Sequence, residues 1–332
     1  MMKYCNNVFY ETKHYIKHLP HFTFKQKIKN LLMWLFYPFL NIYNKILVSF
    51  IYLFHPTNPF KKEYPVVLVA IFKNEAKYLK EWIEYHKLIG VDHFFLYNNN
   101  SEDNYLDILN EYIKDGSVTL TTWPQVPGQI SAYKNWYDKY REKCGYAAFI
   151  DLDEMICPIY DSDIKTWLKR YLKYPVVKMD WMMFGTSSQL SHDTNRLIIE
   201  QYESCWSKRL TIGKCIYNCS FNIDKLNSIC MHLTDVTWYF FKVYPVNDSK
   251  NITLWGGYDI CFRRTHTIQL NHYYSRSLDG LRGKIERGDA VFKDKQFTIS
   301  NYMERENMNK NKDYTIQRFM LQLKLKMNNI KL

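Results

Sequence analysis

Several sequence signals that would assign a function at once are missing from this chain of 332 residues. No Gly-rich GxGxxG segment follows the first strand pattern, and no GxxxxGK[ST] segment occurs, so neither a dinucleotide site nor a P-loop is indicated. No nucleic-acid-binding motif is recognisable, and no small-residue cleavage site near the start indicates a signal peptide. We therefore expect no nucleic-acid partner and no secretory leader.

The eight cysteines lack the spacing of a metal or redox motif. No pair forms CxxC, and the one close pair, Cys215 and Cys219, has no second pair at zinc-finger spacing. This usage predicts reduced, structural thiols and a cytoplasmic location.

The composition is that of a globular protein with a basic surface. Hydrophobic residues make up 47% and charged residues 23%, which fits one large α/β domain or a domain with appendages. The net charge of +12 indicates an anionic partner such as acidic lipid or a phosphorylated substrate. Aromatic residues reach 17%, and they suit sugar faces and membrane interfaces as well as cores.

Residues 1–64 form an N-terminal segment that differs from the rest. A basic stretch at 24–30 precedes an apolar, aromatic run at 31–54, and a proline-containing linker at 55–65 follows. Four residues interrupt the apolar run: Pro38, Asn41, Asn44 and Lys45. We expect a helix or helical hairpin lying in the interface of an anionic membrane. A helix packed against the catalytic domain and a single-pass anchor are the alternatives.

The next 90 residues alternate strand and helix patterns. The strand patterns are "VVLVAIF", "DHFFLY", "VTLTTW" and "YAAFIDLDE", and they are separated by amphipathic segments that end at glycines. This β-α-β-α-β-α-β order predicts a parallel sheet with right-handed crossovers. We therefore expect an α/β fold, with a donor-binding half at 65–155, an acceptor half at 156–299 and a basic helical tail at 300–332.

Polar clusters stand where three of these strands end. "NEA", "NNNSED" and "DLDE" all follow apolar runs, and ligands of such sheets bind beyond the carboxyl ends of the strands. Asp151 and Asp153 are two residues apart, so along an extended strand they would share a face. Two such carboxylates suit Mg²⁺ or Mn²⁺, whereas the simpler interpretation is a solvated strand end.

The ordered motifs resemble those of a known family. "VAIFKNEAKYLKEWIEYHKLIGVDHFFLYNNNSEDN", "FIDLDEMI", "DWMMFGTSS" and "NHYYSRSLDGLRGKIERG" are similar to segments of glycosyltransferase family 92 and of family-2-like glycosyltransferases, over about residues 65 to 290. The resemblance implies a GT-A fold, which is Rossmann-like, and a nucleotide-sugar donor. It makes Asp151 and Asp153 the DxD motif, with Asp153 a direct ligand of Mn²⁺ or Mg²⁺, Asp151 near the ribose or metal, and His272 completing the metal site.

The same resemblance implies further donor contacts. Asn74, Glu75 and Asp103 would hold the nucleotide, although Glu75 also suits the start of a helix on charge grounds alone. The candidates to neutralise the leaving diphosphate are Lys214, Arg276 and Lys284. The alternative for each of these cations is a solvated position on the surface.

The second half supplies the acceptor candidates. Trp181 and Phe184 could stack on a sugar or pack in the core, and Gly185 allows a close backbone approach. The resemblance adds His232, with a core histidine as the alternative. An inverting transfer needs a carboxylate base, for which Glu200 matches a family glutamate and Asp180 is the other candidate.

The sequence thus predicts a metal-dependent, inverting glycosyltransferase at the cytoplasmic face of a membrane. The expected acceptor is a glycan or glycolipid, such as bacterial surface polysaccharide or lipopolysaccharide. Two alternatives remain: a non-catalytic glycan- or nucleotide-binding protein with the same fold, and a metal-dependent phosphohydrolase. The amphipathic, basic tail is expected either to touch the membrane as well or to pack on the domain.

Overall fold

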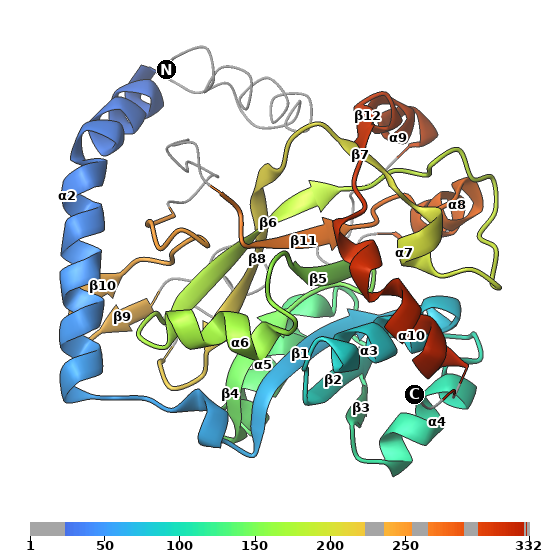
Figure 1. Ribbon diagram of the computed structural model, residues 1–332, viewed down its shortest axis with the longest axis horizontal. Coiled ribbons are helices and arrows are strands. Elements are labelled where there is room, and N and C mark those ends of the chain that lie inside the picture. Colours follow the sequence, from blue (N-terminus) through green and yellow to red (C-terminus); the bar gives the residue numbers. More distant parts are fainter. Residues whose placement is uncertain (1–23, 223–235, 254–264, 289–297, 329, 331–332) are drawn as a thin grey trace.

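The structure is a computed structural model, which describes residues 24–222, 236–253, 265–288, 298–328 and 330 (Figure 1). His232, a candidate acceptor-binding residue, lies outside the described residues. The described cysteines are all free and buried, as the sequence predicts for structural thiols.

A single sheet of eight strands forms the centre of the molecule, in the order β3-β2-β1-β4-β8-β6-β11-β5. Four of its pairs are parallel: β3 with β2, β2 with β1, β1 with β4, and β6 with β11. The strand bounds are β1 Tyr64–Phe72, β2 His93–Asn98, β3 Val118–Thr122, β4 Cys144–Phe149, β5 Glu154–Pro158, β6 Val176–Met183, β8 Leu210–Asn218 and β11 Ile268–His272. The predicted α/β class and mostly parallel sheet are confirmed.

Helices cover both faces of the parallel half. The helices are α3 Ala76–Leu88, α4 Tyr105–Lys114 and α5 Gln129–Tyr140. On β2, Phe94 packs against Trp82 of α3, whereas the neighbouring Phe95 packs against Trp136 of α5. Because successive side chains of a strand point to opposite faces, α3 and α5 lie on opposite sides of the sheet. This double cover explains the continuous apolar run of β1.

The other half of the sheet is mixed. β8 runs antiparallel to both of its neighbours, β4 and β6, and the edge strand β5 runs antiparallel to β11. Short elements connect and cover these strands: α6 Ile164–Leu168, α7 Ile198–Gln201, β7 Ser204–Trp206 and α8 Leu278–Arg287. β11 therefore enters the sheet between β6 and β5, more than a hundred residues after β5 in the chain.

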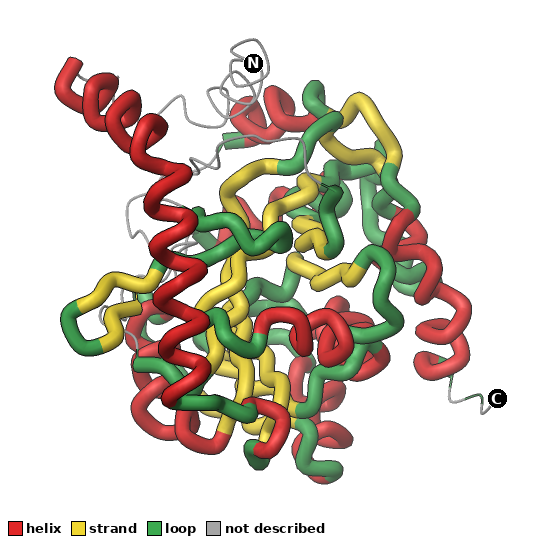
Figure 2. Tube along the Cα trace, turned by 60° about the vertical axis from the view of Figure 1, so that its left-hand side comes forward, coloured by secondary structure: helices red, strands yellow, loops and turns green. Residues whose placement is uncertain are grey.

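The N-terminal segment forms one continuous helix, α2, from Phe24 to Phe54, which passes through Pro38 instead of turning back as a hairpin. It runs along one side of the molecule, next to a short hairpin of β9 Val236–Trp238 and β10 Phe241–Val243 (Figure 2). Leu47, Val48 and Ile51 are buried in the main core. The alternative of a helix packed on the domain is thus confirmed for one face of α2. None of the helices in the described ranges is long and apolar enough to span a membrane.

The C-terminal region returns to the domain. α9 Ile299–Glu306 is followed by β12 Asn309–Lys312, which pairs with β7, and then by α10 Met320–Met327. α10 packs against α3, and its Leu323 is fully buried. Leu321 remains 70% exposed on the outer side of the same helix.

Candidate active site

The acidic motif forms a turn between β4 and β5. The strand β4 ends at Phe149, and the amide of Glu154 donates a hydrogen bond of 2.9 Å to the carbonyl of Asp151. The expectation that Asp151 and Asp153 share one face of an extended strand is therefore wrong. The two carboxylates instead flank Leu152, which is 3% exposed, so burial of this leucine fixes the turn.

Asp153 is largely buried beside a lysine and a histidine. Its Oδ2 accepts a short hydrogen bond from Lys284 of α8, and its Oδ1 lies 3.5 Å from Nε2 of His272 at the end of β11. Burial alone would raise the pKa of Asp153, but Lys284 and His272 hold it well below its usual range. Asp153 is therefore ionised, and two residues that are over a hundred positions away in the chain meet it.

Asp151 is more exposed and has a different partner. Its Oδ2 lies 3.0 Å from Nζ of Lys214, a buried residue of β8, and its Oδ1 accepts a hydrogen bond of 3.1 Å from Gln129 at the start of α5. Burial alone would lower the pKa of Lys214, but Asp151 and Glu154 raise it, so this lysine stays charged. The sequence did not single out Gln129, although its place at the start of a helix beside β4 was a signal for it.

Glu154, the third acid of the motif, holds the turn in place. Its Oε2 accepts from the amide of Asp151 at 2.8 Å, and its Oε1 accepts from Nε1 of Trp181 at 2.6 Å. The side chain is fully buried, and burial raises its pKa. The ring of Trp181 also lies 4.6 Å from that of His272. Trp181 thus orients both a carboxylate and a histidine of the site.

Two arginines connect the end of β1 with the acidic turn. Nη1 of Arg276 lies 2.7 Å from Oε2 of Glu75, Nη1 of Arg287 lies 2.6 Å from Oε1, and Nη2 of Arg276 donates to the carbonyl of Leu152 at 2.7 Å. Burial would raise the pKa of Glu75, but the two arginines lower it. Arg287 was not among the residues predicted from sequence, even though it follows Lys284 by three residues on one helix and so shares its face.

Asn74 and Asp103 tie the two neighbouring loops together. The Oδ1 of Asn74 accepts from the amide of Glu102 at 2.8 Å, and Oδ2 of Asp103 accepts from the amide of Ala76 at 2.7 Å, in the first turn of α3. Asn74 adopts a positive φ of 53°, which asparagine tolerates better than most residues. The buried Oδ1 of Asp103 has no hydrogen-bond partner among the described residues.

The side chains around Asp153 partly suit a divalent cation. Within the described ranges, no group of three or more His, Cys, Asp or Glu residues is arranged to hold a metal ion. Two of the predicted ligands, Asp153 and His272, nevertheless suit a metal ion. Oδ1 of Asp153 is buried without a hydrogen-bond partner from the described residues, and it lies 3.5 Å from Nε2 of His272. Mg²⁺-like cations are often held by one or two side chains and complete their shell with substrate phosphates and water.

Comparison with known proteins decides the family. A sequence model described as glycosyltransferase family 92 matches residues 66–253, more than half of the chain. The chain belongs to glycosyltransferase family 92. The matched range includes the acidic turn, Asp180, Glu200 and Lys214, whereas His272, Arg276 and Lys284 follow it.

Relatives and solved structures set the extent of the likeness. A family 92 protein of Ricinus communis is 31% identical over 257 residues, which are 74% of this chain and 40% of the relative. One of Oryza sativa subsp. japonica is 34% identical over 116 residues, 35% of this chain and 20% of the relative. This family-92 chain therefore spans less than half of the length of these curated relatives. The crystal structure of S. aureus TarS 1–349 is 13% identical, with 47% of each chain covered and a TM-score of 0.33.

The two base candidates of this family-92 chain lie in different surroundings. Asp180 is 4% exposed, lies 3.3 Å from Nζ of Lys178, and alternates along β6 with Trp181, so it lies on the sheet face opposite His272. Glu200 of α7 is partly exposed, and its Oε2 lies 2.8 Å from Nζ of Lys324 on α10. Burial would raise the pKa of Glu200, but Lys324 lowers it, so the carboxylate is ionised.

The acceptor candidates on β6 and just beyond it are mostly covered. Trp181 is 4% exposed, and Phe184 is 2% exposed with its ring 4.8 Å from that of Tyr273. A Cβ on Gly185 would lie 1.8 Å from the side-chain amide of Asn309, so this glycine does admit a close approach, by another part of the same chain. Neither aromatic ring offers a free face to solvent in this structure.

Proposed function

We propose that this chain transfers a sugar from a nucleotide-diphosphate donor to a glycan or glycolipid acceptor. One observation carries the proposal: Asp153 lies beyond the carboxyl end of a parallel strand, beside His272 and Lys284, in a chain that belongs to family 92. Ligands of such sheets bind at this edge. The polar clusters that follow β1, β2 and β4 supply the surrounding donors and acceptors.

We further propose that Asp153 and His272 hold Mn²⁺ or Mg²⁺, with Asp151 as an additional ligand or ribose contact. When bound, the cation would stabilise the negative charge of the leaving diphosphate. Lys284 binds the Oδ2 of Asp153, so it would need to release that oxygen or move toward the phosphates. Lys214 and Arg276 already hold the turn from its two sides and would remain as positive charges beside the donor.

In the proposed reaction, the bond between the anomeric carbon and the diphosphate oxygen breaks. The acceptor oxygen forms the new bond to the anomeric carbon, and its proton passes to a carboxylate of the protein. An inverting course is part of the proposal. Glu200 is favoured over Asp180 as the base, because Asp180 is buried with Lys178 on the sheet face opposite His272.

The proposal extends to the acceptor and its place. A surface polysaccharide or lipopolysaccharide at the cytoplasmic face of a membrane is supported by the net charge of +12. The nucleotide-sugar donor is supported by family membership and by the cations around the acidic turn.

Thermal unfolding with a panel of nucleotide sugars, each with and without Mn²⁺, tests this function. Binding to the native state raises the unfolding temperature by mass action. We expect a metal-dependent rise for one donor class that disappears in Asp153→Asn, together with a loss of turnover of about 100-fold or more. Asp107→Asn, at an exposed position of α4, is the matched control and should retain both the response and the turnover.

The alternatives give different results in the same samples. A folded wild-type protein that responds to no donor and metal would contradict the transferase and favour a non-catalytic binding protein. Release of inorganic phosphate from phosphate esters without any acceptor would instead identify a phosphohydrolase.

A further inference from the structure

Helix α2 carries two apolar stripes, and only one of them is covered. The inner stripe contains the buried Tyr37, Val48 and Ile51, and the buried polar Asn44 lies on the same side. The outer stripe recurs every three or four residues, and these large hydrophobic side chains are 47% to 73% exposed: Leu32, Leu35, Phe39, Ile42, Ile46, Phe50 and Leu53. A soluble protein rarely leaves a continuous apolar strip of this length open to water.

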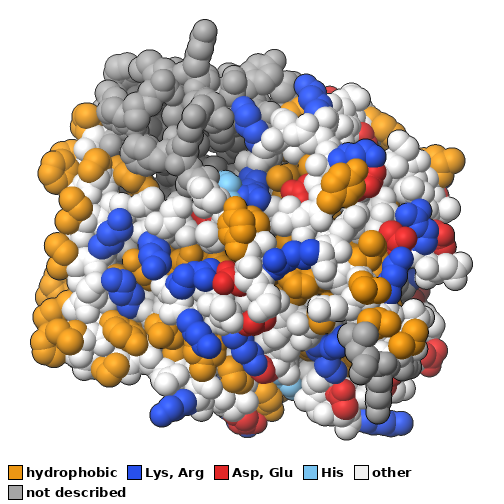
Figure 3. Space-filling model, viewed as in Figure 1, with side chains coloured by type: hydrophobic (Ala, Val, Ile, Leu, Met, Phe, Trp, Pro, Cys, Tyr) orange, Lys and Arg blue, Asp and Glu red, His pale blue; other side chains and the backbone are white. Residues whose placement is uncertain are grey.

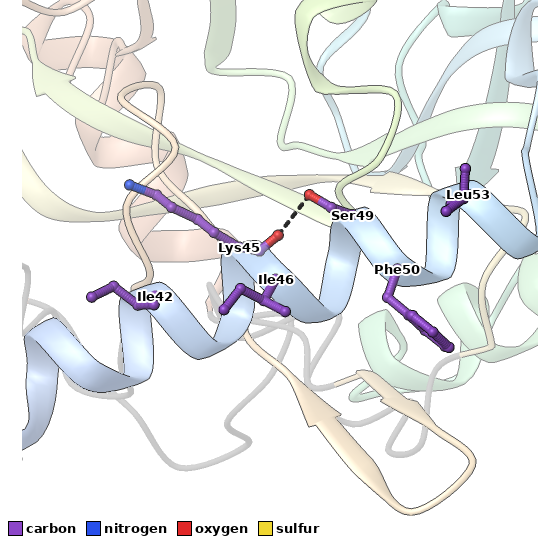
Figure 4. Close-up of a pocket in the computed structure, with 6 residues that line it drawn as sticks. All are labelled: Ile42, Lys45, Ile46, Ser49, Phe50 and Leu53. Atoms are coloured by element: carbon purple, nitrogen blue, oxygen red, sulfur yellow. Dashed lines mark hydrogen bonds between the residues drawn. The ribbon is translucent and has the colours of Figure 1, made fainter.

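The polar residues that interrupt the apolar sequence fix the helix to the domain. Asn44 forms two backbone hydrogen bonds with Tyr244, at 3.1 and 2.8 Å, and Asn41 bonds to Asn251 and to the amide of Ile252. Because these amides face inward, they leave the outward face apolar. Figure 4 shows Ile42, Ile46 and Phe50 on this face of the helix, with Lys45 and Ser49 beside them.

The β9–β10 hairpin continues the same face. The ring of Trp238 lies 6.2 Å from that of Phe50, and the hydroxyl of Tyr43 donates to the carbonyl of Lys242 at 3.4 Å. At the turn of the hairpin, Tyr239 and Phe240 are 78% and 82% exposed. Two segments almost 200 residues apart in the chain thus lie side by side (Figure 2), and both carry exposed hydrophobic side chains.

In the part of the chain that the structure describes, the exposed charges on α2 and the hairpin are all positive. Residues 24–54 contain no acid, and Asp248, the one acid of residues 236–253, is buried. Lys25, Lys27, Lys29 and Lys45 lie on α2, Lys242 and Lys250 lie on or after the hairpin, and Lys173 donates to Ser49 of α2. Burial lowers the pKa of Lys250, and its cationic neighbours Lys173 and Arg170 lower it further. Figure 3 shows hydrophobic side chains gathered along the edge where α2 lies, with basic side chains next to them.

We propose that α2 and the β9–β10 hairpin together form one membrane-binding surface, which lies in the interface of an anionic lipid bilayer without crossing it. An apolar strip with aromatic side chains and basic side chains beside it matches the headgroup region of such a bilayer, whereas a protein partner would not require these basic side chains. The inference does not depend on the transfer reaction, because it rests on side chains remote from the acidic turn in the chain.

Vesicle flotation of the full chain tests the surface. We expect binding to vesicles of phosphatidylcholine with phosphatidylglycerol, and weaker binding to phosphatidylcholine alone. The double variant Ile46→Glu with Leu53→Glu, at positions 65% and 73% exposed, should lower the vesicle affinity about tenfold or more. Phe240→Glu should lower it as well, which separates the hairpin contribution from that of α2.

A matched control exists on α4, where Leu106 and Ile113 are also exposed and also seven residues apart. Leu106→Glu with Ile113→Glu adds the same charge and should leave vesicle binding unchanged. The proposal is overturned if the wild-type chain does not float, if the α4 variant loses as much binding, or if both vesicle types bind equally. A dimer in light scattering that only the α2 variant dissociates, without vesicle binding, would assign the surface to a second copy.

Discussion

Buried carboxylates around the acidic turn each have a different means of compensation. Glu75 is held by two arginines, Asp153 by Lys284 beside His272, and Glu154 by an amide and the indole of Trp181. A buried charge is tolerated only when it is paired and hydrogen-bonded. Glu75 and Asp153 are thus paired with cations, and removing one of these cations leaves a buried carboxylate uncompensated.

Arg276 is the member whose loss should cost the most stability. Its guanidinium is 5% exposed, pairs with Glu75, binds the carbonyl of Leu152 and lies 3.5 Å over the ring of Tyr78. We expect Arg276→Met to lower the free energy of unfolding by about 3 kcal/mol, measured by urea denaturation. Lys87→Met, which breaks an exposed pair with Asp115, should change it by about 0.5 kcal/mol or less. Equal effects of the two variants would contradict the role assigned to Arg276.

Glu81 of α3 should make stability depend on pH near neutrality. It accepts the amides of Ile198 and Ile199, and burial raises its pKa from 4.5 to about 7. An acid whose pKa is raised on folding binds its proton more tightly in the folded state, so its contribution to stability is lost as pH rises from 4.5 to 7. We expect Glu81→Gln to remove up to about 3 kcal/mol of this pH dependence.

Thermal unfolding of both proteins between pH 5 and pH 8 measures the difference. Glu111→Gln, on the exposed side of α4, is the control and should follow the wild-type pH profile. A Glu81→Gln profile parallel to that of the wild type would show that Glu81 does not titrate in this range.

For single residues, the sequence predicted which side chains form the site better than it predicted how the backbone places them. Asp151, Asp153 and His272 were named from motifs, and the structure does bring Asp153 and His272 together. The turn itself was missed, since the backbone change after Phe149 depends on burial of Leu152 and on the hydrogen bond to Glu154. The burial of Trp181 and Phe184 could not be predicted from the sequence either, because their rings pack against residues distant in the chain.

Among the elements, local patterns predicted the donor half and failed for the other half. β1 to β4 and α3 to α5 alternate in sequence as they do in space, so periodicity and glycine stops were sufficient. In the second half, β8 inserts between β4 and β6, and β11 between β6 and β5. Such long-range pairings follow from the side chains of the whole sheet and leave no periodic signal in one segment. The choice between a single helix and a hairpin at Pro38 was left open for the same reason, because contacts to residues 244–252 support the continuous helix.

Docking of α2 should depend on Asn44. Its fully buried amide satisfies both the carbonyl and the amide of Tyr244, which would otherwise lack partners. We expect Asn44→Ala to lower the free energy of unfolding by about 2 kcal/mol. The amide of Tyr244 should also exchange its hydrogen about tenfold faster or more, measured by native-state hydrogen exchange.

Asn110→Ala on α4 is the matched control, because that asparagine is exposed. It should leave both the stability and the exchange of Tyr244 unchanged. If Asn44→Ala also leaves the exchange rate of Tyr244 unchanged, the paired hydrogen bonds do not hold the helix.

For the whole molecule, the N-terminal helix belongs to two surfaces at once. Its inner stripe extends the main hydrophobic core, and its outer stripe continues into the exposed hairpin tip. The expected separation of residues 1–64 from the catalytic part therefore has a physical cost, because cutting at the linker would open the core. The same packing fixes the orientation of the proposed membrane face relative to the sheet, since α2 is bonded to the segment that follows β10.

A chain that begins at residue 55 should consequently be less stable than the full chain, despite losing an exposed apolar face. Removal of α2 uncovers the core around Leu47, Val48 and Ile51, and fully burying such side chains contributes about 1.5–3 kcal/mol each. The summed loss is comparable with the whole stability of an ordinary domain, about 5–15 kcal/mol. We expect the shortened chain to aggregate or to unfold at a much lower temperature, measured by size-exclusion chromatography and thermal unfolding. A chain that begins at residue 24 retains α2 and serves as the control in the same measurements. A monomeric chain from residue 55 with an unchanged unfolding temperature would mean that the inner stripe adds nothing to the core, and that α2 serves the outer surface alone.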